Sequence, residues 1–354
     1  MNVFVARPTK FLLVSYLFTT LAFGQSRTFT NPLLPSGADP WSIHHDGWYY
    51  YTHTTGRNVT LWKTRNLAEL PTAEKQIVWT PPATGPYSKE IWAPELHRRN
   101  NKWYILVAAD NGQNRNHRLW VLENSAADPL TGTFTLKGQL ETPDDKWAID
   151  GSIFEHRGKL YLVWSGWEGE QNGEQAIYLC RLKNPWTARG KRVRISTPTL
   201  DWEKDGTIPR PGPDDKPVVL VNEGPQPLAH GDKLFVIYSA SGCWTESYAL
   251  GLLEAESRKN LRKPRNWKKH PQPVFKAKNV NGTHAAGHNS FFKSPDGTED
   301  WILYHANPEM GQGCGMNRSP RMQKIAWTPD GMPDLGQPVA TGVSMPVPEG
   351  GRTQ

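Results

Sequence analysis

Five segments of the chain share one pattern: a short strand-like stretch that opens on a polar residue, then a turn, then a longer apolar run. In the third segment, Trp147 to Phe154 is followed by the run Gly158 to Trp164. If the five segments are aligned, their opening polar residues are Asp39, the Pro94–Glu95 pair, Asp150, Glu223 and His288. The sequence therefore predicts several carboxylic acids and one imidazole at the same place in a repeated structure.

Carboxylic acids that gather around one point cannot all ionise, because like charges disfavour one another, so at least one should keep its proton. Cleavage of a glycosidic bond needs two carboxyl groups with opposite protonation states, one to protonate the leaving oxygen and one to act as base or nucleophile. A third acid nearby can raise the proton affinity of the acid catalyst. A different interpretation is that each residue is a turn or cap carboxylate bound to backbone amides.

The elements that must position these residues are predicted to be the blades of a β-propeller. The second run of each segment is apolar over almost its whole length, as in a strand buried on both faces. The repeat spacing of roughly 55 to 75 residues exceeds the usual blade length of about 40 to 50 and leaves room for rim loops. We expect an all-β, five-bladed propeller in which the first strand of each blade lines the central channel.

The first 24 residues are typical of a secretory signal peptide, with Arg7 and Lys10 before the apolar stretch Phe11 to Phe23. A membrane anchor is the alternative, although this stretch is shorter than the roughly 20 residues that a span needs. No linker divides residues 25–354, so we predict a single catalytic domain there. The protein is then expected outside the cell, or in the periplasm if the source is bacterial.

The net charge of +7 comes from dispersed lysines and arginines, without the long basic run of a nucleic-acid arm. We therefore predict no nucleic-acid partner and no membrane partner, and we expect a monomer. A weak preference for an acidic polymer remains open. Cys180, Cys243 and Cys314 allow at most one disulfide, and three buried thiols fit the sequence equally well. Asn58, Asn281 and Asn317 match the glycosylation pattern, which matters only in a eukaryotic source.

Sixteen tryptophans are many for this length. Some, such as Trp103 and Trp301, fall in the buried runs and should be core residues. Trp41 and Trp92 stand next to the channel residues, where flat rings suit the C–H faces of a sugar. We predict that these two bind substrate, with core packing as the alternative for each.

The chain resembles glycoside hydrolase family 43, five-bladed propeller enzymes that remove arabinose or xylose from plant polysaccharides. The resemblance runs from Asn31 to about Pro348, and the motifs that carry it, in order, are Ala38-Asp39-Pro40, Ile91 to Leu96, Ile149 to Ser152, Asn222 to Pro225 and Gly287 to Ser290. It implies that Asp39 is the general base, Asp150 the residue that tunes the acid and orients substrate, and Glu223 the general acid. The family inverts configuration, so Asp39 would activate a water molecule.

Two further expectations come from the same resemblance. His288 matches a position that faces a water-coordinated calcium ion on the propeller axis, although calcium prefers oxygen ligands, so a water-bridged contact is the easier one. Arg321 resembles the arginine that reaches the sugar hydroxyls, with a surface cation as the alternative. No cofactor is required for the chemistry.

The opening motifs most resemble the α-L-arabinofuranosidase branch of the family. We expect release of terminal α-L-arabinofuranosyl residues from arabinan or arabinoxylan, so the expected partner is a plant polysaccharide or oligosaccharide. A β-xylosidase and an endo-1,5-α-L-arabinanase are the alternatives within the family. A sugar-binding propeller without catalysis is the alternative from another class.

Overall fold

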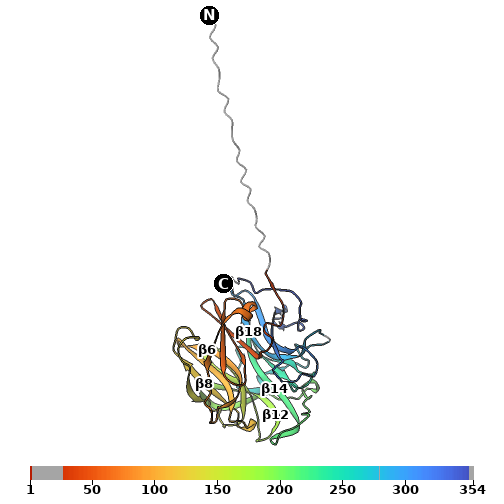
Figure 1. The fold of residues 1–354 in the computed structure, drawn as a ribbon. Helices are drawn as coiled ribbons and strands as arrows, with labels where there is room; N and C mark the ends of the chain where they lie inside the picture. The colour runs from red at the N-terminus through yellow and green to blue at the C-terminus, as the bar shows by residue number, and fades with distance from the viewer. Residues whose placement is uncertain (2–26, 279, 351–354) are drawn as a thin grey trace.

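The computed structural model describes residues 1, 27–278 and 280–350, so the predicted signal peptide lies outside the described residues apart from Met1. Nearly all the regular structure is β-strand, and the sheets follow one another in chain order around a common axis (Figure 1). Among the described residues, no helix is long and apolar enough to cross a membrane.

The first two blades are four-stranded antiparallel sheets. The strands of blade one are β2 (Ala38–His45), β3 (Trp48–Thr54), β4 (Val59–Thr64) and β5 (Glu74–Trp79). Those of blade two are β6 (Lys89–Arg99), β7 (Lys102–Asp110), β8 (Arg118–Asn124) and β9 (Thr135–Gln139).

Blades three and four are joined into one larger sheet by a short parallel ladder between β12 and β14. The strands of blade three are β10 (Ala148–His156), β11 (Lys159–Gly166), β12 (Asn172–Asn184) and β13 (Thr187–Ser196). Those of blade four are β14 (Asp215–His230), β15 (Lys233–Ala240), β16 (Ala249–Glu256) and β17 (Lys268–Lys269).

Blade five consists of β18 (His284–Lys293), β19 (Asp300–Asn307) and β20 (Ser319–Lys324), and the start of the chain runs along its edge. Leu33 N donates to Pro320 O at 2.8 Å. The Asn31 amide donates to Met322 O at 2.9 Å and accepts from Met322 N at 3.0 Å. One side chain thus makes the two hydrogen bonds that a paired strand would make, and it helps to close the ring.

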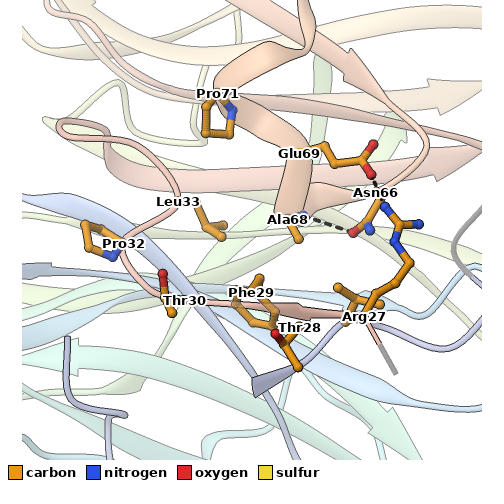
Figure 2. A pocket seen from close by; sticks show the side chains of 11 residues that line it. Arg27, Thr28, Phe29, Thr30, Pro32, Leu33, Asn66, Ala68, Glu69 and Pro71 are labelled. Carbon is orange, nitrogen blue, oxygen red and sulfur yellow. Dashed lines mark hydrogen bonds and ion pairs between the residues drawn. The ribbon is translucent and has the colours of Figure 1, made fainter. Parts of the chain in front are cut away.

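The remaining elements are short. The strands outside the blades are β1 (Thr28–Phe29), which pairs with β23 (Met345–Pro346), and β21 (Ala326–Trp327), which pairs with β22 (Pro333–Asp334). The 3-10 helices are η1 (Leu67–Thr72), η2 (Asn114–Asn116), η3 (Asp201–Glu203) and η4 (Pro264–Asn266). A pocket between the N-terminal segment and η1 contains none of the predicted site residues (Figure 2).

The hydrophobic core consists of clusters between successive blades, and one of them packs blade five against blade one, joining Leu303 to Tyr51. Along β7, Trp103 and Ile105 pack toward blade one while Tyr104 and Leu106 pack toward blade three. Because both faces of a blade are buried, the second strands are apolar over most of their length rather than only at alternate positions. The predicted five-bladed propeller is confirmed.

Candidate active site

The innermost strand of each blade has a break in its pairing register at the same place. In β2 the break falls between Ala38 and Trp41, and in β10 between Ile149 and Ser152. The residues with positive φ at these breaks are Asp39 (57°), Ala93 (41°), Asp150 (54°), Gly224 (54°) and His288 (48°). A bulge of this kind redirects side chains and is strained for a residue with a Cβ, so it persists only where the surroundings hold it. The repeated bulge brings Asp39, Asp150 and His288 to one end of the channel.

The bulges also correct the alignment of the five segments. In blade four the left-handed position is Gly224, because a Cβ there would lie 3.2–3.3 Å from ring atoms of His288. Glu223 therefore comes one residue before the bulge position. Glu95 comes two residues after the equivalent Ala93, and it is buried with its Oε2 3.0 Å from His97 Nε2. Glu95 does not line the cavity, so three of the four acids from the aligned segments reach it, and Glu90 from the start of β6 lines it as well.

A cavity of about 400 Å³ lies at the bulged end. Asp39, Asp150, Glu223 and His288 all line it, as the sequence predicted. Its walls include Trp92, Trp147, Trp244, Arg318 and the disulfide between Cys243 and Cys314.

Asp39 is held in its ionised form by the groups around it. Its Oδ1 lies 3.1 Å from His288 Nδ1 and 3.3 Å from Arg318 Nη1, and its Oδ2 accepts a hydrogen bond from Thr54 Oγ1 at 2.5 Å. Burial alone would raise the pKa of Asp39, but the charges of His288 and Arg318 outweigh it and hold this pKa well below its usual value. His305 stays neutral beside it, because burial lowers its pKa to about 3 and its Nδ1 accepts from Asp39 N at 3.0 Å.

Asp150 and Glu223 have the opposite environment. Burial raises the pKa of Asp150 to about 7, assisted by the nearby Glu223 and opposed by His288. Burial likewise raises the pKa of Glu223, against the effect of His288. Because the two carboxyls interact, they titrate as a pair. The pair therefore keeps a proton at a pH where Asp39 has lost its own.

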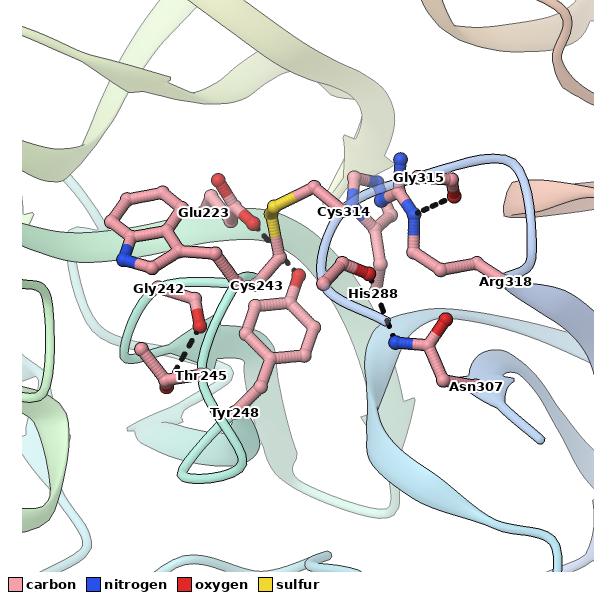
Figure 3. Close-up of a disulfide and its surroundings, with 12 residues drawn as sticks. Glu223, Gly242, Cys243, Thr245, Tyr248, His288, Asn307, Cys314, Gly315 and Arg318 are labelled. Atoms are coloured by element: carbon pink, nitrogen blue, oxygen red, sulfur yellow. Dashed lines mark hydrogen bonds between the residues drawn. A yellow bond between two sulfur atoms is a disulfide. The ribbon is translucent and has the colours of Figure 1, made fainter. Parts of the chain in front are cut away.

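Tyr248 holds the Glu223 carboxyl in place, with its hydroxyl donating to Glu223 Oε1 at 2.7 Å (Figure 3). Gly287 gives room for this tyrosine, since a Cβ there would lie 2.3 Å from a ring carbon of Tyr248. Gly224 N donates to Asp150 Oδ2 at 3.0 Å, so the bulge of blade four positions the carboxyl of blade three.

His288 interacts electrostatically with all three carboxyls. Burial alone would lower its pKa, but the nearby Asp39, Asp150 and Glu223 raise it, so the imidazole acts as a cation among acids. Calcium takes six to eight oxygen ligands. Within the described residues, no group of three or more His, Cys, Asp or Glu side chains is arranged to hold a metal ion. The side chains around His288 therefore do not form a direct calcium cage, and the water-bridged contact with an ion stays a prediction.

Only one of the two predicted sugar-binding tryptophans reaches the cavity. Trp92 lines it and stacks on His117 with ring centroids 4.0 Å apart. Trp41 packs against blade two, where its Nε1 donates to Leu96 O at 3.1 Å. Trp41 follows the bulge of β2, which changes the face to which the next side chains point. The prediction for Trp41 is therefore corrected to a packing role.

Arg321 also lies away from the cavity. It is fully buried, and its guanidinium donates to Gly282 O at 2.6 Å and to Thr283 Oγ1 at 2.8 Å. The structure thus corrects the expected contact between Arg321 and sugar. The arginine in the cavity is Arg318, three residues earlier.

A disulfide ties two loops together at the cavity rim. Cys243 follows β15 and Cys314 lies between β19 and β20, and the bond joins them next to Glu223 and His288 (Figure 3). The first loop carries Trp244 and the second carries Arg318. Cys180 is a buried free thiol, so the sequence limit of at most one disulfide holds.

Sequence reasoning missed Tyr248, Thr54, Arg318 and the pairing of the cysteines. Thr54 is the last residue of β3 and Tyr248 directly precedes β16, and nothing in the repeated pattern marks either position. The adjacent Cys243 and Trp244 were the only sequence feature that pointed to the rim. They did not indicate which distant loop would pair with them.

Comparison with known proteins identifies the family. The model for glycosyl hydrolases family 43 matches residues 29–333. The chain belongs to this family. It is 38% identical to an extracellular exo-α-(1→5)-L-arabinofuranosidase of Streptomyces avermitilis over 90% of the chain and 65% of that protein. It is equally identical to an enzyme of the same name from Streptomyces chartreusis, over 78% of the chain and 82% of that protein.

The solved structures agree with the fold. The crystal structure of an α-L-arabinofuranosidase from Lactobacillus brevis is 32% identical, with a TM-score of 0.81, over 89% of this chain and 98% of that one. The chain spans somewhat less than two thirds of the length of some curated relatives, 65% of the Streptomyces avermitilis protein and 64% of an α-L-arabinofuranosidase of Humicola insolens.

Proposed function

We propose that the protein is a secreted, inverting, exo-acting α-L-arabinofuranosidase that releases terminal arabinofuranosyl residues from arabinan or arabinoxylan. The observation that carries this proposal is the contrast between Asp39 and the pair Asp150 and Glu223 in one cavity. The surroundings of Asp39 favour its carboxylate, whereas those of Asp150 and Glu223 favour a retained proton. Glycosidic bond cleavage requires this division between base and acid.

In the proposed mechanism, the Asp39 carboxylate takes a proton from a water molecule as that water attacks the anomeric carbon. Glu223, held by Tyr248, gives its proton to the departing glycosidic oxygen. Asp150 keeps the proton affinity of Glu223 high and, with Trp92, orients the sugar. His288 and Arg318 hold Asp39 ionised and in place.

The choice of arabinofuranose rests on the relatives, whose names specify exo-acting α-L-arabinofuranosidases. Secretion is supported by their description as extracellular and by the disulfide, which persists in oxidising compartments.

The test is a release assay with aryl α-L-arabinofuranoside, aryl β-D-xyloside and linear arabinan. We expect turnover of the arabinofuranoside, free arabinose as the sole early product from arabinan, and first-formed arabinose of inverted anomeric configuration by proton NMR. Preference for the xyloside would identify a β-xylosidase, and early oligosaccharides would identify an endo-arabinanase. Binding without turnover of any substrate would mean a lectin-like protein.

A further inference from the structure

A second cavity, of about 510 Å³, lies at the opposite end of blades three and four from the carboxyls. Strand β10 connects the two regions, with Asp150 near its start and His156 at its end. Six residues of extended strand span about 20 Å. The turn after β10 uses positive φ at Arg157 (49°) and Gly158 (68°) and presents Arg157 and Lys159 at this cavity.

The lining of this cavity, which we call the cationic cleft, is basic. Six cations line it and no carboxylate does: Arg157, Lys159, Arg181, Arg258, Lys259 and Arg262. Arg258 and Lys259 have Glu256 as an ion-pair partner. The other four have no carboxylate within ion-pair distance among the described residues. Like charges this close repel one another, and an anion bound in the cleft would reduce that repulsion.

Two donors in the wall of the cleft need acceptors. The Nε atoms of Arg181 and Arg262 are buried and have no hydrogen-bond partner among the described residues. A buried donor without an acceptor is destabilising, and a guanidinium is the side chain best matched to a carboxylate. Both guanidiniums line the cleft without a carboxylate partner among the described residues, so an anionic oxygen there would meet two unpaired charges.

The shape of the cationic cleft argues against nucleic acid. Single strands are bound by an extended basic groove with exposed aromatic platforms. Here the cations are confined to one cavity, and the aromatic Tyr161 is only 6% exposed, with Arg181 lying over its ring at 5.5 Å. Tyr161 is therefore not available to stack with a base, and the other ring in the described lining, His156, is held by Ser257 O at 2.7 Å from its Nε2.

We propose that the cationic cleft binds the carboxylates of a polyuronate chain. The choice of an acidic polysaccharide rests on the proposed function, because an enzyme that trims neutral side chains gains from an anchor on the acidic polymer that carries them. A second attachment point raises the effective concentration of substrate at the active site without a new contact there.

The experiment measures binding of polygalacturonate to the whole protein by isothermal titration calorimetry, with neutral arabinan and duplex DNA of equal charge concentration as comparison ligands. The test variant is Arg157→Glu/Lys159→Glu, in which both side chains are exposed. The charge-matched control is Lys75→Glu/Lys278→Glu, which changes two exposed lysines outside the cleft. We expect polygalacturonate to bind the wild type and the control alike, and the test variant at least about tenfold more weakly.

Equal affinity of the test variant and the control, no binding by the wild type, or tighter binding of DNA than of polygalacturonate would each overturn the proposal. Turnover of the aryl arabinofuranoside is measured in parallel and should be the same in all three proteins, since the cleft is remote from the carboxyls. A wild-type protein that turns over the aryl arabinofuranoside but does not bind polygalacturonate would refute the anchor alone. Binding without turnover would refute the proposed function alone.

Discussion

The active-site cavity has two walls that are built in different ways. One wall consists of Asp39, Asp150, Glu223 and His288, which the innermost strands place through a bulge repeated from blade to blade. The other wall consists of Trp244 and Arg318 on two loops that the disulfide joins. In the proposed mechanism the strand-borne wall contains the groups that exchange protons, while Arg318 on the loop-borne wall lowers the pKa of Asp39. Changes to the first wall should therefore act mainly on turnover, and changes to the second mainly on substrate binding and pH dependence.

The largest effect is expected for Asp39→Asn. This variant keeps the shape of the side chain but cannot take a proton from water, so kcat/KM should fall by about 10² to 10⁴-fold on an arabino-oligosaccharide and on the aryl arabinofuranoside alike. Steady-state kinetics on both substrates provide the measurement. Glu95→Gln is the control, because Glu95 is an equally buried acid outside the cavity. A strong loss in the control with a mild one in Asp39→Asn would show that the base has been assigned to the wrong residue.

Glu223→Ala should separate the two substrates. A sugar alkoxide needs a proton to depart, so the oligosaccharide should lose about 10² to 10⁴-fold in kcat/KM. A nitrophenolate departs with little assistance, so the aryl substrate should lose much less. Tyr248→Phe removes the hydrogen bond to Glu223 without removing the acid. It should therefore also lose more kcat/KM on the oligosaccharide than on the aryl substrate, but by a smaller factor. An equal loss of Glu223→Ala on both substrates, with Asp39→Asn spared by the good leaving group, would mean that the two roles are reversed.

The same division explains what the sequence could predict. The strand-borne wall was predictable because the apolar runs mark each blade, and a polar residue at the same point of repeated blades must face the same channel end. Glu95 and Trp41 were misplaced because a bulge inserts a residue, after which the alternation of side chains no longer indicates their direction.

The loop-borne wall was not predictable, since loops 241–248 and 308–318 have no periodicity that relates them. The family resemblance indicates Arg321, and only the structure shows that β20 begins at Ser319. Arg321 lies within that strand and is buried, while Arg318 precedes it and reaches Asp39.

Removal of the disulfide should change the loop-borne wall without destroying the site. In Cys243→Ser/Cys314→Ser, the free energy of unfolding should fall by about 2–4 kcal/mol. The reason is that the bond closes a long loop, since the two cysteines are 71 residues apart. The freed loop should hold Arg318 less firmly against Asp39, so the pKa of Asp39 should rise and the acidic limb of the pH profile should move upward. Arg318→Gln removes the charge altogether and should move the acidic limb further in the same direction.

The measurements for the disulfide are thermal or denaturant unfolding and pH profiles of kcat/KM. Cys180→Ser serves as a control for the loss of a sulfur, since Cys180 is buried in the cluster between blades two and three. A stability loss in the double variant with an unchanged acidic limb would mean that the disulfide supports the fold and leaves the charge around Asp39 unaltered.

The smallest expected effect is a shift of the basic limb in Asp150→Asn. Glu223 acts as an acid only while it is protonated, so the pH at which activity falls on the alkaline side reports the pKa of the coupled pair. Burial raises the pKa of Glu223, and an ionised neighbour raises it further, because removing the proton then creates two adjacent negative charges. The amide has no charge, so the pKa of Glu223 should fall and the basic limb should move to lower pH, while the acidic limb, which reports Asp39, should move little. The profile of kcat/KM on the oligosaccharide measures both limbs, and an unchanged basic limb would restrict Asp150 to the positioning of substrate.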